Sequence, residues 1–573
     1  MADAAIAFAN NDMVLLVWRY GQKLDGCLGF SVQRRAGTAN APGRWIPLPA
    51  WVGFEGQDNP AWKASDTDIW PIQKFSWKDL TARRGRTYSY RIVPMMGAVG
   101  ALTPDLGRAV ETPHPVVLSP KRGVFRTFFN RGILSTQFVT HALPKAADGS
   151  PDTVSLLTHG TTPGDPLREA LAGDILTGLL TLLRRVKVYG GRCYAALYEL
   201  ADKQLLAALV ESPALSIILS NTGADDAENH DARTALHAQA DTQVTDRFIT
   251  NGIGHNKFVV YEDARGVAQA VLLGSTNWTW TALVGQSNNA LIVESPELAA
   301  RYLDYWRRLK ADTRADGHGQ QGEPLRTSDN QPGDWFAIDP KGAPDARARV
   351  WFSPNTARKR ASPVPAQEPA PGDLAEVFAL MDAAQHAILF LEFQPGSPSV
   401  IDHAAAISLA RPDLFVRGAV TDPAAAQNFR TVLFHRPGAD PEAVAPASAI
   451  KDQFAFWQAE LLKSSAGAHA IIHDKIVVID PISPDCVVVT GSHNQGYTAS
   501  HNNDENLLIV KGHGPLAQAY AAHVMDIYDH YRFRFILQEK GHQAFSGLHR
   551  DDGWQDPYFT GTRLADESRP WGL

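Results

Sequence analysis

HNKFVVYE at residues 255–262 and HDKIVVID at residues 473–480 decide the fold, because the same pattern of charged and apolar residues occurs twice. Each stretch is followed by a second shared one, GSTN at 274–277 and GSHN at 491–494. A third shared stretch, LIV, ends at Val293 and at Val510, and a single one-residue gap aligns all three. An isolated H-x-K has no weight, but this conjunction at near-constant offset indicates an internal duplication.

The rest of the duplicated region has the composition of an α/β fold. Apolar runs of strand length, such as LSIILS from Leu215 and AILFLEF from Ala387, alternate with amphipathic stretches. Such alternation predicts helices packed around a largely buried sheet. We therefore expect two homologous α/β halves, at residues 115–312 and 340–540.

The first residues have a different pattern. Short β-branched and aromatic runs alternate with turn signals over residues 1–112, which predicts a small all-β sandwich. A W-x-D segment and a G-x-x-Y-x-Y strand resemble a fibronectin type III module, through Trp77, Asp79, Gly85, Tyr88 and Tyr90. This resemblance implies a spacer or docking module without chemistry of its own. Residues 541–573 form a polar and aromatic C-terminal tail without clear periodicity.

The repeated motif resembles the H-x-K-x(4)-D signature of the phospholipase D superfamily, with its following G-S-x-N. The second copy matches fully, whereas the first has Glu262 at the acid position, where Asp480 stands in the second. We expect Glu262 to substitute, since that acid is a structural hydrogen-bonding group in the family. The resemblance implies that the halves pack about a pseudo-twofold axis with both histidines at the seam. One chain would then be catalytically complete, which favours a monomer.

Phosphodiester chemistry explains the residue types, because negative charge develops on the phosphoryl oxygens and needs positioned cations and N–H donors. Lys257 and Lys475 would clamp these oxygens, and the amides of Asn277 and Asn494 would donate to them. Ser275 and Ser492 would support the phosphate or the surrounding loops. No metal or cofactor is expected. The resemblance further implies a two-step displacement through a phosphohistidine, with His255 as the nucleophile and His473 as the acid and base.

Aligning the two LIV stretches places Glu505 opposite Asn288. A carboxylate partner raises the pKa of a histidine and favours the imidazolium. If each half's carboxylate contacts its own histidine, His473 becomes the better acid and His255 the better neutral nucleophile. Contacts that cross between the halves would overturn this reasoning.

Charge bears on the substrate. The chain has 54 basic and 61 acidic residues, a net charge of −7, which suits a polynucleotide poorly. We therefore favour a phospholipid or related phosphodiester, hydrolysed or transferred to an alcohol, with transient contact to a membrane surface. A metal-independent nuclease is the alternative and would need a basic groove beside the lysines. A catalytically silent scaffold protein is an alternative of another class.

Cysteine content and the N-terminal residues bear on the compartment. Three widely spaced cysteines cannot form a disulfide framework, so a reducing environment is expected. The first residues lack the basic and long apolar regions of a signal peptide. The sequence therefore predicts a cytoplasmic protein, with export by a dedicated secretion system left open. Near the start of the first half, FFNRGILSTQF from Phe128 combines the polar Asn130 and Arg131 with an apolar run. Packing of a loop is the expected role of Arg131, and contact with the site is the alternative.

Overall fold

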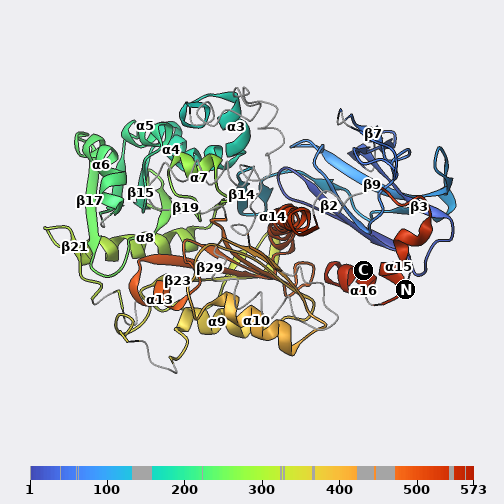
Figure 1. Cartoon of the computed structure of the whole chain (residues 1–573). Helices are drawn as coiled ribbons and strands as arrows, with labels where there is room; N and C mark the ends of the chain where they lie inside the picture. Colours follow the sequence, from blue (N-terminus) through green and yellow to red (C-terminus); the bar gives the residue numbers. More distant parts are fainter. Residues whose placement is uncertain are drawn as a thin grey trace.

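The computed structural model describes three structural parts (Figure 1). The described residues are 2–573 without 39–40, 60, 62, 132–157, 222–223, 323–324, 327–329, 364–367, 422–443, 447–471, 541–546 and 562. An all-β region is followed by two α/β halves, as the sequence predicts.

The N-terminal region is a sandwich of two main sheets. One sheet has the order β1 (Ala4–Ala9), β2 (Val14–Arg19) and β8 (Ser76–Asp79). The other has the order β10 (Ala101–Pro104), β9 (Thr87–Ala98), β3 (Cys27–Thr38) and β4 (Ala41–Pro42), with β5 (Ile46–Pro47), β11 (Val110–Glu111) and β12 (Val116–Val117) beside them. A small pair, β6 (Pro49–Ala50) and β7 (Ser65–Asp66), and a short 3-10 helix, η1 (Leu106–Arg108), complete it. Aromatic side chains at alternate strand positions fill the space between the sheets, for example Trp18, Phe30 and Tyr90.

The first-half sheet has nine strands in the order β13, β14, β20, β19, β18, β15, β16, β17 and β21. Strands β15 to β17 and β21 are parallel to their neighbours on that side, and the other pairs are antiparallel. The strand bounds are β13 (Lys121–Arg122), β14 (Phe125–Phe129), β15 (Arg192–Leu197), β16 (Leu215–Ser220), β17 (Thr242–Ile249), β18 (Lys257–Glu262), β19 (Ala268–Gly274), β20 (Asn289–Val293) and β21 (His318–Gly319). The helices are α3 (Pro166–Ala172), α4 (Ile175–Tyr189), α5 (Lys203–Val210), α6 (Ala224–His237), α7 (Trp280–Val284) and α8 (Pro296–Asp312).

The second-half sheet repeats this strand order as β22, β23, β29, β28, β27, β24, β25 and β26. Its strands are β22 (Phe336–Asp339), β23 (Ala343–Ser353), β24 (Ala387–Glu392), β25 (Phe415–Val420), β26 (Val444–Pro446), β27 (Lys475–Ile479), β28 (Val487–Gly491) and β29 (Glu505–Lys511). Its helices are α9 (Gly372–Asp382), α10 (Val400–Ala410), α13 (Tyr497–Asn502) and α14 (Gly514–Lys540). Apart from β21, which belongs to the first-half sheet alone among the described strands, the two orders correspond strand by strand and confirm the predicted duplication at the level of topology.

The two sheets face each other across one shared core. Helices α8 and α14 lie between the sheets, while α4 and α9 cover their outer faces (Figure 1). Apolar side chains of α8 and α14 pack against strands of both halves, including β18 and β27. Because a single core joins the halves, their relative position is set by packing over a large apolar area.

The sandwich is not a tethered module. Phe8, Leu15 and Val17 of its first two strands belong to the same core as the sheets of the two α/β halves. The C-terminal segment returns to the sandwich, with η5 (Asp552–Gln555), α15 (Asp556–Phe559), α16 (Arg563–Ser568) and η6 (Arg569–Trp571). Trp554 packs edge-to-face on Phe30, with 5.7 Å between ring centroids, and its indole N–H donates to the carbonyl of Cys27 at 2.9 Å. The sandwich therefore packs as an integral part of the molecule.

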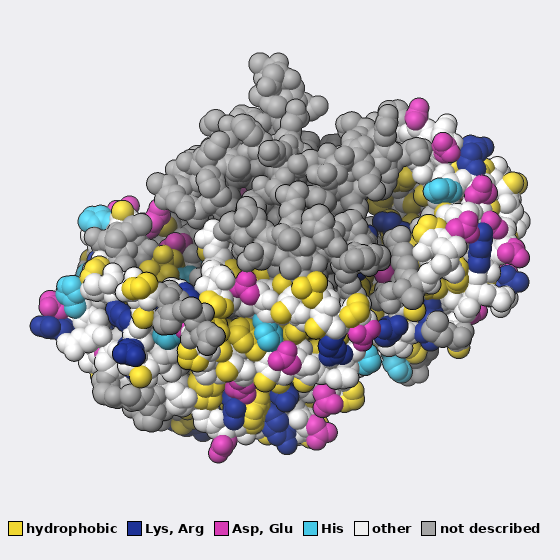
Figure 2. Space-filling model, turned by 60° about the horizontal axis from the view of Figure 1, so that its bottom comes forward, with side chains coloured by type: hydrophobic (Ala, Val, Ile, Leu, Met, Phe, Trp, Pro, Cys, Tyr) yellow, Lys and Arg dark blue, Asp and Glu magenta, His cyan; other side chains and the backbone are white. Residues whose placement is uncertain are grey.

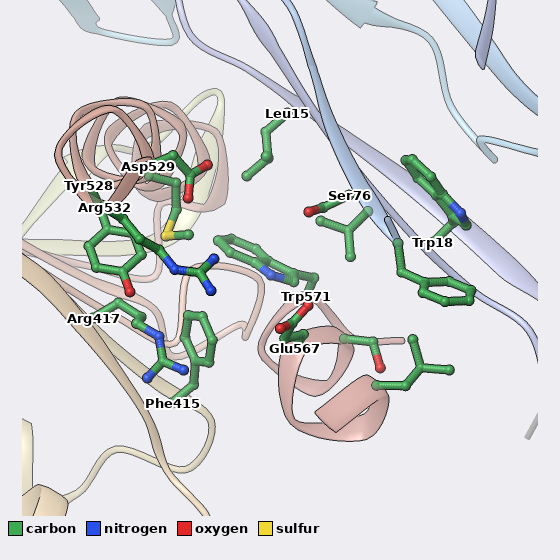
Figure 3. Close-up of a pocket in the computed structure, with 15 residues that line it drawn as sticks. Leu15, Trp18, Ser76, Phe415, Arg417, Tyr528, Asp529, Arg532, Glu567 and Trp571 are labelled. Atoms are coloured by element: carbon green, nitrogen blue, oxygen red, sulfur yellow. The ribbon is translucent and has the colours of Figure 1, made fainter. Parts of the chain in front are cut away.

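A cavity of about 60 Å³ lies where the sandwich, α14, β25 and the C-terminal segment meet. Figure 3 shows Trp571 in its middle, between Leu15 of β2 and Arg532 of α14. Its lining residues include neither motif histidine.

Candidate active site

Each motif histidine lies just before a strand whose first residue is the motif lysine. His255 and His473 are each 3% exposed, and Lys257 and Lys475 begin β18 and β27. The lysine Nζ donates to the carbonyl of its own histidine, at 2.8 Å in the first half and 2.7 Å in the second. The short H-x-K spacing thus holds a lysine ammonium group against the backbone of each motif histidine.

The histidines are oriented by residues of the opposite half. His255 Nδ1 lies 3.2 Å from Glu505 Oε1, and His473 Nδ1 lies 2.9 Å from Asn288 Oδ1. Backbone bonds cross in the same way, from His473 N to Ser287 O at 3.0 Å and from Asp504 N to Ile253 O at 3.0 Å. Both imidazoles therefore lie at the seam between the halves.

This crossing corrects the sequence-based argument for the roles of the histidines. From the sequence, these roles were expected if Glu505 contacts His473 of its own half. In the structure, Glu505 contacts His255 of the other half. The partner of His473 is a neutral amide. Asn288 Nδ2 donates to the carbonyl of Ala282 at 3.0 Å, so Asn288 Oδ1 faces the ring and His473 Nδ1 carries the proton.

Burial and the neighbouring lysines shift the titration of the site. Burial first, then the charge of Lys257, lowers the pKa of His255 to about 4, although Glu505 opposes this. Burial and the charges of Lys475 and Lys257 hold the pKa of His473 well below its ordinary value. Burial raises the pKa of Glu505, but the His255 charge and hydrogen bond outweigh it and bring the pKa to about 2. Without an anionic ligand, both imidazoles are neutral at pH 7 and Glu505 is ionised.

The two motif asparagines flank these groups. Asn277 Nδ2 donates to Glu199 Oε2 at 2.6 Å, and the backbone N–H of Asn494 donates to Glu505 Oε2 at 3.0 Å. Asn503 donates to the other Glu505 oxygen at 2.8 Å. The carboxylate that contacts His255 is thus fixed by two further donors.

The motif serines brace the strands around the site. Ser275 Oγ donates to Asn288 Oδ1 at 2.9 Å and accepts from the N–H of Asn289 at 3.0 Å. Ser492 Oγ accepts from the backbone N–H and the side-chain amide of Asn506, both at 3.1 Å. Of the two roles expected for the serines, the contacts match support of the surrounding loops.

The two motif acids differ in their contacts. Asp480 accepts bonds of 2.7 to 2.8 Å from three consecutive backbone N–H groups at residues 385–387, where β24 begins. Glu262 instead accepts from the hydroxyl of Tyr194 at 3.3 Å and lies 3.9 Å from the Arg307 guanidinium. Among the described contacts, Glu262 does not take over the backbone role of Asp480.

Two aromatic residues at the site were missed by the sequence analysis. The Tyr198 ring lies 4.9 Å from the His255 ring and 4.9 Å from Lys257 Nζ. Phe393 has the same relation to His473 and Lys475, at 4.8 Å in each case. Both follow the last residue of the strand that pairs with the motif strand, so aligning AALYEL with FLEFQP would have revealed them.

A buried carboxyl group was also missed. Glu392 ends β24 directly opposite Lys475, and neither of its oxygens has a hydrogen-bond partner in the part of the chain that is described. The corresponding residue of the first half is Leu197, opposite Lys257. Burial holds the pKa of Glu392 well above its ordinary value, although the charge of Lys475 opposes this.

Other expectations concern metals, membranes and the residues at the start of the first half. Within the described residues, no group of three or more His, Cys, Asp or Glu side chains is arranged to hold a metal ion. None of the described helices is long and apolar enough to cross a bilayer. Lys and Arg side chains are interspersed with Asp and Glu over the described part of the face in Figure 2. Arg131 faces the sandwich, 3.7 Å from Asp12.

Comparison with known families agrees with this geometry. The family described as "Cardiolipin synthase, PLD-like domain" matches residues 181–310 and 441–527, and each matched segment contains one histidine, lysine and asparagine of the site. The two regions of the chain that carry the motif thus match a phospholipase D-like domain. No curated protein matches it.

Three solved structures illustrate how distant the known relatives are. Phosphatidylserine synthase from Haemophilus influenzae is 14% identical, with 63% of this chain and 84% of that chain covered and a TM-score of 0.40. A phospholipase D family member from Salmonella typhimurium is 20% identical over 22% of this chain and 84% of its own, with a TM-score of 0.19. Yeast tyrosyl-DNA phosphodiesterase is 9% identical over 56% of this chain and 82% of its own, with a TM-score of 0.30. Similarities this low carry no argument about substrate.

Proposed function

We propose that the chain cleaves a phosphodiester in two displacements through a phosphohistidine on His255. The observation that carries the proposal is the pair of crossed contacts, His255 with Glu505 and His473 with Asn288. They give two equivalent imidazoles unequal partners, and a two-step displacement needs one nucleophile and one acid.

In the first step, His255 Nε2 attacks phosphorus, and the bond from phosphorus to the leaving oxygen breaks. A proton on His473 Nε2 passes to that oxygen, so an alcohol leaves. In the second step, His473 takes a proton from water, the new oxygen bonds to phosphorus, and the N–P bond breaks. Lys257 and Lys475 stabilise the charge on the nonbridging oxygens in both steps. An alcohol in place of water would give transfer instead of hydrolysis.

The carboxylate of Glu505 favours His255 as the nucleophile. Glu505 Oε1 lies 3.2 Å from Nδ1 and favours the tautomer that carries its proton there, which leaves the lone pair of His255 on Nε2. After Nε2 bonds to phosphorus, the ring still holds the Nδ1 proton and is positively charged, and the adjacent carboxylate stabilises that cation. Asn288 gives His473 no such charge stabilisation, so a proton on His473 is released more easily.

Substrate binding would allow His473 to take up the proton that it needs from solvent. In the free protein the pKa of His473 is depressed by burial and then by Lys475 and Lys257. A phosphodiester anion between the lysines neutralises part of that charge and so raises the pKa of the imidazole. The acid form would therefore appear together with the substrate.

A phospholipid or related small phosphodiester is the substrate class that we propose, since a net charge of −7 suits a polynucleotide poorly. The test offers phosphatidylcholine, bis-p-nitrophenyl phosphate and DNA side by side in excess EDTA, with a His255→Ala variant as the control. We expect turnover of the first two that the variant lacks. Cleavage of DNA alone would replace the lipid proposal by a nuclease, and activity restored only by a divalent ion would reject the metal-free mechanism.

A further inference from the structure

Asn130, the residue after β14, is 2% exposed and holds the segment that carries Asn288. Its amide nitrogen donates to the carbonyls of Ala282 at 2.9 Å and Leu283 at 3.1 Å, and also to that of Gln286. Its Oδ1 accepts from the backbone N–H of Asn288 at 2.8 Å. We name these four contacts the Asn130 clamp.

The clamp acts on the only described side chain bonded to His473 Nδ1. Asn288 is fixed at its backbone by Asn130 and at its amide nitrogen by the Ala282 carbonyl, which Asn130 also contacts. The remaining Asn288 atom, Oδ1, accepts from His473 at 2.9 Å. A shift of Asn288 would therefore rotate the imidazole or leave its Nδ1 proton without an acceptor.

The second half has no corresponding clamp among its described residues. Strand register places Ser353 opposite Glu505, where Asn130 stands opposite Asn288. The Ser353 hydroxyl is buried without a hydrogen-bond partner in the described chain. Glu505 is instead held by Asn503 and by the backbone of Asn494. Asn288, which contacts His473, is thus held by a different set of contacts from Glu505, which contacts His255.

The N-terminal sandwich holds the strand from which the clamp extends. Asn11 donates to the carbonyl of Thr127 at 2.5 Å and to Asp174 Oδ2 at 2.7 Å. The other Asp174 oxygen accepts from the N–H of Phe129, the last residue of β14, at 2.9 Å. Asn11 and Thr127 have no measurable exposure, so these bonds are shielded from competing water.

We propose that Asn130 is a positioning residue for His473, and that Asn11 of the sandwich supports it through β14. The inference rests on the proposed function, because it assigns His473 as the acid. The sandwich then contributes to catalysis by fixing one side of the site. It does so through buried hydrogen bonds and contributes no reacting group.

Leaving-group dependence separates this role from a general loss of structure. Asn130→Ala is assayed on a diester with an alkyl alcohol leaving group and on one with p-nitrophenolate, which needs no proton. We expect the rate of the first displacement, measured as the pre-steady-state release of the leaving group, to fall about 10- to 100-fold with the alkyl substrate, since a misplaced catalytic group costs this much. The same rate should change less than about threefold with the aryl substrate, whose leaving group needs no proton. Asn11→Ala should give the same pattern with a smaller loss.

Ser353→Ala is the matched control and should resemble the wild-type protein on both substrates. Equal loss on both substrates for Asn130→Ala or Asn11→Ala, with or without a lowered melting temperature, would overturn the inference. If His473→Ala shows leaving-group dependence and neither clamp variant does, this inference fails and the proposed function stands. If the wild-type protein cleaves neither diester, the proposed function fails.

Discussion

The two halves share a strand order and differ in the residues that face their histidines. Each sheet brings one histidine, one lysine and one aromatic ring to the seam with nearly equal geometry. The partner of the first-half histidine is the carboxylate of Glu505, and that of the second-half histidine is the amide of Asn288. Duplication thus supplies a symmetric set of histidines and lysines, and different residues at equivalent positions give the two imidazoles different partners.

The largest expected difference between the halves is between the two histidine variants. His255→Ala should form no covalent intermediate with any leaving group, and activity should fall by about 10³-fold or more, because the nucleophile is absent. His473→Ala should still be phosphorylated by an aryl diester and accumulate phosphohistidine, since the base that activates water is missing. Peptide mapping by mass spectrometry decides this, and label on the His473 peptide of His255→Ala would reverse the roles.

Glu505→Gln should slow formation of the intermediate by about 10- to 100-fold, the usual cost of losing an orienting partner. Because Glu505 contacts His255 and raises its pKa, the neutral amide should make Nε2 less basic and the phosphorylated ring less stable. The pre-steady-state burst with an aryl diester measures this step. A normal burst with a lowered upper pH limit would instead indicate that Glu505 serves the acid.

Binding of sulfate, which has no proton to exchange in this range, should be accompanied by proton uptake near pH 6. The pKa of His255 is about 4 and that of His473 is well below its ordinary value, so both rings are neutral before binding. The bound anion raises both values, and the protein must bind up to about one proton as a result. Calorimetry in buffers of different ionisation enthalpy measures the uptake. Proton release would contradict the account.

Leu197 is the first-half residue that corresponds to Glu392, so Glu392→Leu makes the two halves alike at this position. Of the variants in these predictions, it should have the smallest effect on activity. Burial lowers the pKa of Lys475 to about 8 and Glu392 opposes this, so its loss lowers the pKa further. Lys475 then loses its proton at lower pH, and kcat/KM should fall several-fold at pH 8 with little change at pH 6. The pH profile tests this, with Glu392→Gln as a shape-preserving comparison. A uniform loss at all pH values would show a packing role only.

The repeat could be predicted because its two copies have the same residue types at the same spacing. His255 and His473, with their lysines, follow from the alignment, and so does the opposition of Glu505 and Asn288. Alternating residues such as Tyr88, Tyr90 and Ile92 indicated that the sandwich consists of strands. These features are local, so one segment at a time reveals them.

The crossed contacts could not be predicted, because alignment states which residues are equivalent and not how the halves face each other. Glu262 illustrates a second limit. It matches Asp480 in the motif, but the longer side chain contacts Tyr194, where Asp480 accepts three backbone bonds. The C-terminal segment has no periodicity because its aromatic residues pack on a sandwich far away in sequence.

The return of the C-terminal segment to the sandwich bears on the order of synthesis. The sandwich strands are synthesised before the two α/β halves, but Trp554 and Tyr558 of the sandwich core are synthesised only after both halves. Until Trp554 has been synthesised, Phe30 and Phe75 of the sandwich core stay partly uncovered, since both rings pack against Trp554. A chain released early would carry its defect at the opposite end from the truncation, as an open N-terminal domain for chaperones and proteases to recognise.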